Sequence, residues 1–290
     1  MRILLTGADG FTGRFFKAQA VASGHEVLPL SADLTNLDAL QQHVGQSAPD
    51  AVVHLAAISF VGHSDSNAFY AVNVVGTTNL LTVLAQLPIP PRRVLLASSA
   101  NVYGNCEQSP IVESQTPAPV NHYAMSKLAM EHMARTFSDR LHLIITRPFN
   151  YTGPGQSVDF LIPKLVEHFA RKAPSIALGN LNVEREFNDV QMVCRTYLQL
   201  LQFGEAGETY NVCSGQPYTM QHVIDTLSKI TGHQLHVVVS PVFFRANEVH
   251  RLCGSPVKLQ ALLTTHGDRL INPPLEDTLR RMLAAAGARV

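Results

Sequence analysis

Two residues that can move protons stand four positions apart in this chain, Tyr123 and Lys127. On a helix, residues at this spacing lie on one face and their side chains meet. The lysine ammonium favours the ionised phenol, so the pKa of Tyr123 is expected to fall below its usual value of about 10. A phenol tuned in this way can exchange a proton with an alcohol or carbonyl oxygen, which contributes about 10²–10⁴ in rate. Because the spacing alone is common, its meaning depends on the motifs around it.

A glycine-rich turn follows the first apolar segment of the chain. Arg2–Thr6 reads as a buried strand, and Gly7, Gly10 and Gly13 follow it at GxxGxxG spacing. Glycines there allow a tight turn and let the backbone approach a diphosphate, while the helix expected over about 11–23 points its positive amino end at that anion. The spacing differs from the GxGxxG dinucleotide fingerprint, but its place between a strand and a helix predicts a diphosphate site.

A third motif is an apolar strand that ends in hydroxyl groups. Residues 94–97 read Val-Leu-Leu-Ala, and Ser98 and Ser99 follow directly. Ligands of doubly wound sheets bind beyond the carboxyl ends of the strands. Both hydroxyls are therefore expected to face the bound molecule.

These motifs lie within a regular alternation of strand and helix patterns over the first 150 residues. The order predicts an α/β fold with a doubly wound parallel sheet covered on both faces, a Rossmann-type architecture. The expected strands are 2–6, 25–30, 51–55, 93–97 and 141–146, and the expected helices are 11–23, 36–44, 67–87 and 121–138.

The segment 153–156, Gly-Pro-Gly-Gln, breaks the alternation, and beyond it helices mix with short strands. This change indicates a smaller carboxyl-terminal substrate lobe after the dinucleotide-binding Rossmann domain. A helix expected over 189–203 and a strand expected over 210–213 continue the strand–helix alternation, so they are expected to rejoin the sheet. The expected division is 1–150 with 188–214 for the Rossmann domain, and 151–187 with 215–290 for the substrate lobe.

The composition excludes several classes of protein. With 22 basic and 22 acidic residues among 290, and only 15% of residues charged, the chain offers no basic stripe for nucleic acid. The four cysteines have no paired spacing, and the 13 histidines form no HxxxH or HExxH metal motif. No uninterrupted apolar run approaches the ~18 residues of a membrane span, and the first strand meets the glycine turn too early for a signal peptide. We expect a cytoplasmic protein without a metal, a membrane span or a nucleic-acid partner.

Together, the GxxGxxG turn, Ser99 after the fourth strand and the YxxxK pair resemble the extended short-chain dehydrogenase/reductase family. The resemblance implies that Ser99 hydrogen-bonds a substrate carbonyl, that Tyr123 donates the proton, and that Lys127 both tunes Tyr123 and holds the nicotinamide ribose. It extends along essentially the whole chain. Three further segments match the family's positions: His-Leu-Ala-Ala at 54–57, Asn-Val-Val-Gly-Thr at 73–77 and Arg-Pro-Phe-Asn at 147–150.

The resemblance also implies an NAD(P) cofactor. NAD-selective members usually carry an acidic residue at the end of the second strand, where it binds the ribose 2′-hydroxyl. This chain has Ser31 there and Asp33 two residues later, so NADP(H) is favoured over NAD(H). Arg14 could reach a 2′-phosphate or could equally be a solvated helix residue. The residues implied to bind the cofactor are Gly7, Gly10, Phe11, Thr12, Gly13, Ser31, Asp33, Leu34, Leu55, Ala56, Ala57, Asn73, Ala97, Ser98, Tyr123, Lys127 and Pro148.

Charged residues in the last third of the chain suit a nucleotide diphosphate. Arg185 and Arg245 each offer a planar guanidinium that donates two hydrogen bonds to phosphate oxygens, and Glu248 can accept from a ribose diol. Read singly, each is a solvated surface charge, but their order resembles the nucleotide-sugar branch of the family. The residues implied to bind a small-molecule nucleotide sugar are Ser99, Asn101, Asn150, Asn180, Arg185, Arg245 and Glu248.

Two segments narrow the resemblance within that branch. Gly-Asn-Leu at 179–181 and the run 245–248 are similar to enzymes that act on GDP-mannose derivatives. Arg-Pro-Phe-Asn-Tyr-Thr-Gly-Pro-Gly-Gln at 147–156 resembles the GDP-6-deoxy-D-mannose reductases, which reduce the C4 ketone of a GDP-4-keto-6-deoxyhexose to GDP-D-rhamnose. The proline-rich loop 109–120 is a candidate cover for the site. The family also implies a homodimer formed through the helices that carry Asn73 and Tyr123.

Missing residues exclude related reactions. Sugar 4,6-dehydratases place carboxylates at the two positions after the hydroxyl-bearing residue, where this chain has Ala100 and Asn101. Fucose-type synthases use a Cys in the same segment and a later His, but here Cys106 lies beyond the segment and Phe160 stands near the His position. Ketone reduction fits the remaining residues. The alternatives are a nucleotide-sugar 4-epimerase with tightly bound NAD and a non-catalytic NAD(P) redox sensor.

Overall fold

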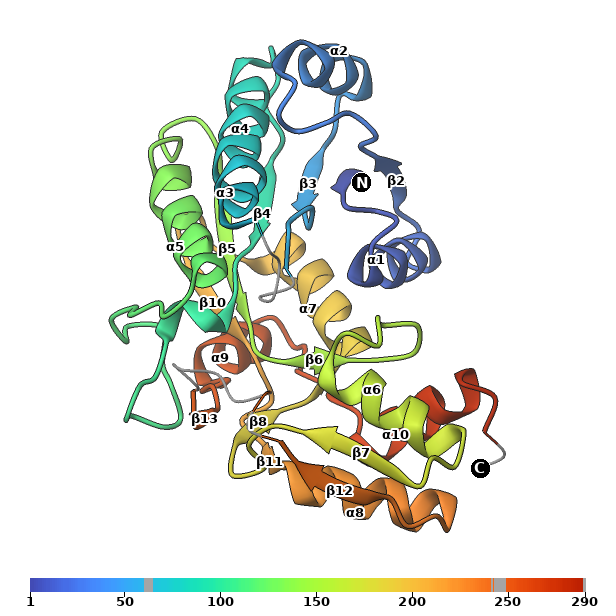
Figure 1. The fold of residues 1–290 in the computed structure, drawn as a ribbon. Coiled ribbons are helices and arrows are strands. Elements are labelled where there is room, and N and C mark those ends of the chain that lie inside the picture. The colour runs from blue at the N-terminus through green and yellow to red at the C-terminus, as the bar shows by residue number, and fades with distance from the viewer. Residues whose placement is uncertain (60–64, 241, 243–248, 289–290) are drawn as a thin grey trace.

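A six-stranded parallel sheet forms the centre of the computed structural model, in the order β10-β5-β4-β3-β1-β2 (Figure 1). The structure describes residues 1–59, 65–240, 242 and 249–288. The predicted doubly wound α/β fold is confirmed, and the chain returns to the edge of the sheet with its sixth strand. The strands of the sheet are β1 (Arg2–Thr6), β2 (Glu26–Pro29), β3 (Ala51–His54), β4 (Arg93–Ala97), β5 (Leu143–Pro148) and β10 (Thr209–Val212).

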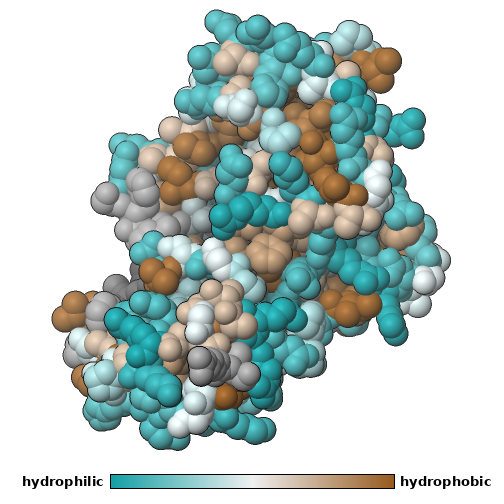
Figure 2. All heavy atoms as spheres, turned by 90° about the vertical axis from the view of Figure 1, so that its right-hand side faces the viewer, coloured by the Kyte–Doolittle hydropathy of each residue, from teal (hydrophilic) through white to brown (hydrophobic). Residues whose placement is uncertain are grey.

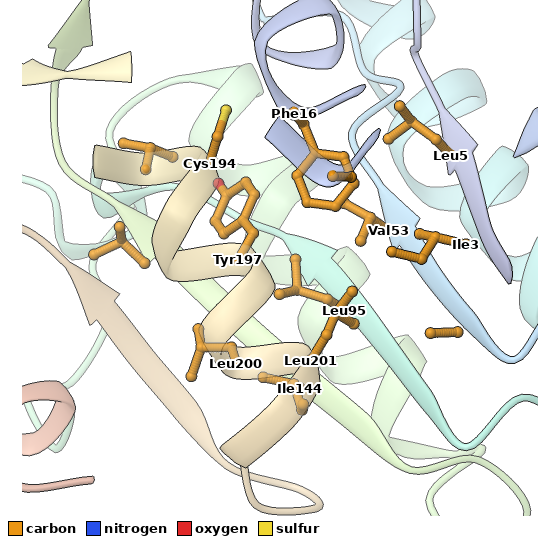
Figure 3. Packing of buried hydrophobic residues seen from close by; sticks show 14 of the residues in the cluster. Ile3, Leu5, Phe16, Val53, Leu95, Ile144, Cys194, Tyr197, Leu200 and Leu201 are labelled. Carbon is orange, nitrogen blue, oxygen red and sulfur yellow. The ribbon is translucent and has the colours of Figure 1, made fainter. Parts of the chain in front are cut away.

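Helices cover both faces of this sheet, so its strands are apolar on both sides. On one face, Leu5, Val53 and Leu95 pack with Phe16 and Tyr197 (Figure 3). The alternate residues of the same strands point to the opposite face, as the two-residue period of a strand requires. The helices on the first face are α1 (Phe11–Ala22) and α7 (Val190–Phe203), and those on the second are α2 (Leu37–Ser47), α4 (Thr77–Gln86) and α5 (His122–Arg135).

The order of the strands reverses beside β1, which pairs with β2 on one side and β3 on the other. In sheets of this kind the ligand crevice lies at that reversal, beyond the carboxyl ends of the strands. Thr6, the last residue of β1, is in register with His54, the last residue of β3. The glycine turn after Thr6 and the segment after His54 therefore meet at the crevice.

Side-chain caps fix the starts of several helices. Asn36 accepts from the Ala39 N–H at 3.1 Å at the start of α2, and Asn121 accepts from the Ala124 N–H at 2.8 Å at the start of α5. Such caps satisfy donors that have no partner within the helix. The cap at Asn121 places Tyr123 in the first turn of α5.

One long helical segment, 66–86, contains a π-helical turn. It consists of α3 (Ser66–Tyr70), the π-turn η1 (Ala71–Gly76) and α4. In length and mean hydropathy it is the one helix among the described residues that could cross a membrane, although no uninterrupted apolar run has that length. Leu80, Leu81 and Leu84 are fully buried in the core beneath the sheet, which identifies it as a core helix.

The rest of the chain forms a smaller lobe around a second apolar core (Figure 1). Short strand pairs and a three-stranded sheet lie beside its helices. The helices are α6 (Leu161–Ala170), α8 (Met220–Thr231) and α10 (Leu275–Ala285), while α9 (Val257–Thr265) packs on β10 and α7. The strands are β6 (Tyr151–Thr152), β7 (Ser175–Leu178), β8 (Glu184–Glu186), β9 (Asn188–Asp189), β11 (Pro217–Thr219), β12 (His236–Val239) and β13 (Arg251–Leu252).

The loop 109–120 joins the two lobes. Ile111 donates its N–H to the carbonyl of Cys253 at 2.8 Å and accepts from the N–H of Ser255 at 2.8 Å. Its carbonyl also accepts from the side chain of Asn211 in β10 at 3.0 Å. Figure 2 shows the face of the molecule on which α1 lies, where apolar residues gather between patches of polar ones.

Candidate active site

The glycine turn packs so closely that side chains are excluded from it. Gly7 has φ +68°, and a Cβ added there would lie 2.8 Å from the backbone nitrogen of Ala56. A Cβ on Gly13 would lie 2.0 Å from the Gly7 carbonyl oxygen. Helix α1 begins after Gly10 without a side-chain cap, so its first N–H groups are available to an anion. A cradle of this form at the crevice fits the diphosphate of a dinucleotide.

A buried hydrogen-bond network supports the floor of this crevice. The Thr6 hydroxyl accepts from the two backbone N–H groups after His54, at 3.1 and 3.0 Å, and therefore donates to His54 Nδ1 at 2.7 Å. His54 Nε2 then donates to Thr77 at 2.8 Å, and Thr77 donates to the Asn73 carbonyl at 2.7 Å. Burial, with a smaller contribution from Lys127, lowers the pKa of His54 to about 3. His54 is thus a neutral imidazole with a fixed tautomer.

The side chain of Asn73 links this network to α5. Asn73 lies in the π-turn, where its amide accepts from the Ile58 N–H at 3.0 Å and donates to the Ser126 hydroxyl at 3.0 Å. Ser126 donates to the Tyr123 carbonyl at 2.8 Å. Asn73 therefore acts on the crevice by holding the segment after β3, which contains Leu55, Ala56 and Ala57, against the Tyr123 helix.

The residues after β2 are placed at the surface. Ser31 is exposed, and the Asp33 carboxylate accepts from the backbone and the hydroxyl of Thr35, both at 2.8 Å, which lowers the pKa of Asp33. Leu34 is buried against Gly76. Arg14 donates to the Gly155 carbonyl at 3.2 Å, so the structure holds this guanidinium toward the loop after β6.

Ser99, Tyr123 and Lys127 come together at the carboxyl end of β4. Ser99 is the second residue after the strand, accepts from the Asn101 N–H at 3.1 Å and lies close enough to Tyr123 to affect the pKa of its phenol. Lys127 donates from Nζ to the Ala97 carbonyl at 2.7 Å. All three predicted catalytic side chains are less than 10% exposed, in the positions that the predicted elements give them.

The expected lowering of the Tyr123 pKa by Lys127 is wrong in this structure. Burial raises the pKa of Tyr123, and the neighbouring Ser99 hydroxyl opposes that rise. Burial lowers the pKa of Lys127 to about 8, and the Glu131 carboxylate opposes that fall. The physical reason is that removing the phenol and the ammonium from water disfavours both charged forms, a cost that the YxxxK spacing does not reveal.

Two further residues of the site escaped the sequence prediction. Glu131 accepts from the Ser98 hydroxyl at 2.5 Å, and its only sequence signal is that it lies one more helical turn after Lys127. Tyr151 follows β5 and hydrogen-bonds Thr12 at 2.8 Å, while its ring stacks on Phe11 at 6.2 Å. An aromatic residue just after the carboxyl end of a strand was the available signal for Tyr151.

Other predicted cofactor and substrate residues lie on neighbouring strand ends. Pro148 ends β5, and Asn150 follows it and accepts from the Asn188 N–H at 2.9 Å through its carbonyl. Asn101 lies in the 3₁₀ turn η2 (Ala100–Tyr103), directly after Ser99.

The remaining predicted substrate residues belong to the smaller lobe. Asn180 follows β7 and accepts from the Asn182 N–H at 2.9 Å. Arg185 in β8 donates to the carbonyl oxygens of Glu184 at 2.9 Å and His250 at 3.0 Å, and to that of Val249. These bonds tie Arg185 to Val249 and His250, which directly follow the predicted residue Glu248 in the sequence. Arg245 and Glu248 lie outside the described residues.

Comparison with known proteins agrees with this geometry. A family model described as GDP-mannose 4,6 dehydratase matches residues 29–264. A GDP-6-deoxy-D-mannose reductase from Pseudomonas aeruginosa is 35% identical, over 89% of each chain. The chain belongs to the nucleotide-sugar branch of the extended short-chain dehydrogenase/reductase family. It is accordingly an NAD(P)-dependent oxidoreductase of nucleotide sugars.

Other similar proteins range from 33% to 44% identity. A GDP-6-deoxy-D-talose 4-dehydrogenase from Aggregatibacter actinomycetemcomitans is 36% identical, over 91% of each chain. The structure of RMD from P. aeruginosa complexed with NADPH has a TM-score of 0.89 and 33% identity, over 99% of this chain and 100% of that one. A Burkholderia cenocepacia J2315 structure, provisionally described as an epimerase, has a TM-score of 0.92 and 44% identity, over 98% and 97%.

Proposed function

We propose that this enzyme uses NADPH to reduce the C4 ketone of a GDP-4-keto-6-deoxyhexose and that the product is GDP-D-rhamnose. The observation that carries the proposal is the pair of hydroxyls on Ser99 and Tyr123, which are buried side by side at the carboxyl end of β4. Two such donors can hold one carbonyl oxygen between them. The proposed substrate oxygen is therefore O4, with C4 turned toward the crevice.

The two residues that follow Ser99 favour reduction over dehydration. Removing water across C5 and C6 requires a group that takes the C5 proton and a group that protonates the C6 oxygen. Ala100 is buried and Asn101 is half-buried in the turn η2, and neither side chain exchanges protons at neutral pH. The site thus offers one acid, Tyr123, and reduction of a ketone needs only one.

A protonated Tyr123 is the form that reduction requires. Because burial raises the pKa of this phenol, it carries its proton at neutral pH and can donate it. Negative charge on O4 grows as the transition state is approached, so the hydrogen bonds from Ser99 and Tyr123 strengthen there and lower the barrier. Tyr123 then transfers its proton to O4 and completes the alcohol.

The cofactor would be held by the glycine turn at its diphosphate and by Lys127 at the nicotinamide ribose. When bound, the reduced nicotinamide supplies the hydride that C4 accepts. The Lys127 ammonium, held at Ala97 by a 2.7 Å hydrogen bond, has further N–H groups that can donate to ribose hydroxyls. After proton transfer, the same positive charge stabilises the Tyr123 phenolate.

NADPH is proposed over NADH because the end of β2 carries no acidic residue. Ser31 is exposed after the strand, and an uncharged hydroxyl there tolerates a 2′-phosphate. The NADPH complex of RMD from P. aeruginosa supports this choice. Since Arg14 donates to Gly155, we expect the preference to be modest.

For the nucleotide, we propose that Arg185 and Arg245 bind the diphosphate and that Glu248 binds the ribose, with Asn101, Asn150 and Asn180 lining the rest of the site. Arg185 lies beside the strand that follows the Arg245 segment, which supports a joint role. The two relatives described as GDP-6-deoxy-sugar enzymes support GDP as the nucleotide.

We further propose a cytoplasmic homodimer in which the helical segment of α3, η1 and α4 forms the interface together with α5. Val75 in η1 and Met125 in α5 are large apolar residues that are 52% and 44% exposed, and the two segments pack together, which supports this choice of surface. We retain the division into a Rossmann domain (1–150 and 188–214) and a substrate lobe (151–187 and 215–290) as a proposal.

A 4-epimerase is the second candidate, favoured by the 44% identity to the provisional B. cenocepacia epimerase. It would oxidise and reduce C4 in turn and keep its NAD bound. The deciding experiment incubates the purified protein with GDP-4-keto-6-deoxymannose and NADPH, follows the nicotinamide absorbance and identifies the sugar by NMR. We expect one NADPH consumed per GDP-D-rhamnose formed. Stoichiometric NAD in the purified protein and no consumption of NADPH would establish the epimerase instead.

A further inference from the structure

Three consecutive residues at the carboxyl end of β4 each meet a different turn of α5. Tyr123 lies beside Ser99, Lys127 donates to the carbonyl of Ala97 at 2.7 Å, and Glu131 accepts from the Ser98 hydroxyl at 2.5 Å. The three helical residues are spaced by four, so they form one row along the face of α5 that meets the strand. Glu131 thereby extends the proposed catalytic row by one turn.

Glu131 is a buried carboxylate with a second fixed partner. Its side chain is 2% exposed and pairs with Arg147 of β5, whose side chain is 6% exposed. Arg147 donates to both carboxylate oxygens, at 3.0 Å from Nε and at 2.6 Å from Nη2. Such a bidentate pair fixes the orientation of both groups. The remaining Glu131 contact, with Ser98, is thus made in a fixed geometry.

The charged and titratable groups around Lys127 show why the negative charge of Glu131 matters for keeping its ammonium protonated. Tyr123 and Glu131 are on its own helix, His54 lies on β3, and Arg147 approaches from β5 behind Glu131. His54 is neutral and Tyr123 is protonated, so Glu131 is the one negative group of this set. Arg147, which also lies 4.8 Å over the Tyr103 ring, faces the far side of the carboxylate.

We propose that Glu131 is a positioning residue of the active site, which anchors the end of β4 through Ser98 and keeps Lys127 in its charged form through its own negative charge. The inference rests on the proposed role of Lys127 in holding the cofactor. Removing the charge of Glu131 leaves Lys127 in a dry site beside Arg147, where the ammonium is less favoured. Lys127 would then lose its proton at a lower pH.

The test measures the dissociation constant of NADPH by fluorescence between pH 6.5 and 10, without any sugar. Because burial already lowers the pKa of Lys127 to about 8, we expect wild-type affinity to fall above that pH. Lys127→Met should remove this pH dependence. Glu131→Gln, which keeps the shape and an acceptor for Ser98, should move the fall to lower pH by about one unit, a tenfold change in proton affinity.

Glu186→Gln is the matched control. Glu186 is an equally buried carboxylate, in the three-stranded sheet of the smaller lobe, where its oxygens accept from Ser214 and Gly254. Its replacement should destabilise the protein but leave unchanged the pH at which the affinity for NADPH falls. If Glu131 had a merely structural role, both variants would lose NADPH affinity at the same pH as the wild type. That result for Glu131→Gln would overturn the inference.

Two safeguards keep the result decisive. If Glu131→Gln does not fold, Glu131→Leu with Arg147→Met removes both members of the pair, a replacement that buried pairs often tolerate. NADPH affinity should again fall at a lower pH, by a smaller shift, because the attracting charge of Glu131 is lost but the repelling charge of Arg147 is lost with it. If the wild type shows no alkaline fall that depends on Lys127, the proposed role of Lys127 fails and the inference fails with it. If that fall exists but neither Glu131 variant moves it, only the inference fails.

Discussion

The hydroxyl of Tyr151 in β6 lies 2.8 Å from the hydroxyl of Thr12 in the first turn of α1. The Tyr151 ring stacks on Phe11 with an interplanar angle of 13°. The two residues that begin α1 are therefore held by a residue far away in the sequence, 139 positions from Thr12. The start of α1 is fixed both by its glycine turn and by this tyrosine.

We expect Tyr151→Phe to weaken NADPH binding about fivefold, because a hydrogen bond is worth about 1 kcal/mol and the stacked ring is kept. Thr12→Val removes the other hydroxyl and should act alike. In the double variant the two losses should not add, since both break one bond. Titration of NADPH into the four proteins measures this coupling, and fully additive losses would show that the two hydroxyls act independently.

Tyr123→Phe tests the proton donor directly. The change keeps the ring's packing and deletes the hydroxyl, so turnover should fall by at least ~10² while the affinity for the nucleotide sugar stays nearly unchanged. Tyr218→Phe, which removes a hydroxyl from the smaller lobe, is the control and should keep wild-type turnover. Steady-state kinetics with NADPH check both, and a Tyr123→Phe enzyme with half of wild-type turnover would remove Tyr123 from the mechanism.

His54 should make the protein sensitive to acid. Its pKa is lowered to about 3 in the folded state, against about 6.5 in the unfolded chain. Between these values the unfolded chain binds more protons, so the contribution of His54 to stability is complete above pH 6.5 and is lost as the pH falls toward 3. The loss is about 1.4 kcal/mol for each pH unit in that window.

Chemical denaturation at several pH values measures this effect. His54→Gln, which can still accept from Thr6 and donate to Thr77, should lower stability at pH 7 and flatten its decline below pH 6.5. His132→Gln changes an exposed histidine on α5 and should leave the decline as it is. If the free energy of unfolding declined equally steeply with falling pH in the wild type and in His54→Gln, other groups would be the cause of the acid sensitivity.

The arginine assignments predict a loss of nucleotide affinity. Arg185→Ala and Arg245→Ala should each raise the dissociation constant for GDP about tenfold or more, because a charge-assisted hydrogen bond is worth about 1.5–3 kcal/mol. Arg280→Ala removes an exposed guanidinium that pairs with Glu276 within α10, and it should bind GDP normally. Wild-type affinity in the Arg185 and Arg245 variants would make these arginines ordinary surface charges.

The sequence predicted those features that depend on local pattern. The apolar segments predicted the strands of the sheet. The four-residue spacing predicted that Tyr123 and Lys127 lie together, because strand and helix periods decide which side chains share a face. The strand expected to begin at 141 begins instead at Leu143 and extends to Pro148, since pairing with β4 and β10 sets its ends.

Features that depend on distant contacts could not be read in this way. Glu131 becomes part of the site only because Arg147 and Ser98 meet it in the folded chain, and Tyr151 only because its side chain contacts Phe11 and Thr12 at the start of α1. The raised pKa of Tyr123 has the same origin, because burial is a property of all the elements that surround a group.

The last prediction separates reductase from dehydratase. Given GDP-mannose and NADP⁺, the enzyme should form no 4-keto-6-deoxy sugar, because the turn η2 offers Ala100 and Asn101 where a dehydratase needs proton-transferring carboxylates. Given the pre-formed 4-keto-6-deoxy sugar, it should oxidise one NADPH for each sugar reduced. Mass spectrometry detects dehydration as the loss of one water. Loss of water from GDP-mannose would mean that another acid/base pair, which the residues after Ser99 do not provide, acts on C5 and C6, and the reductase proposal would then have to be withdrawn.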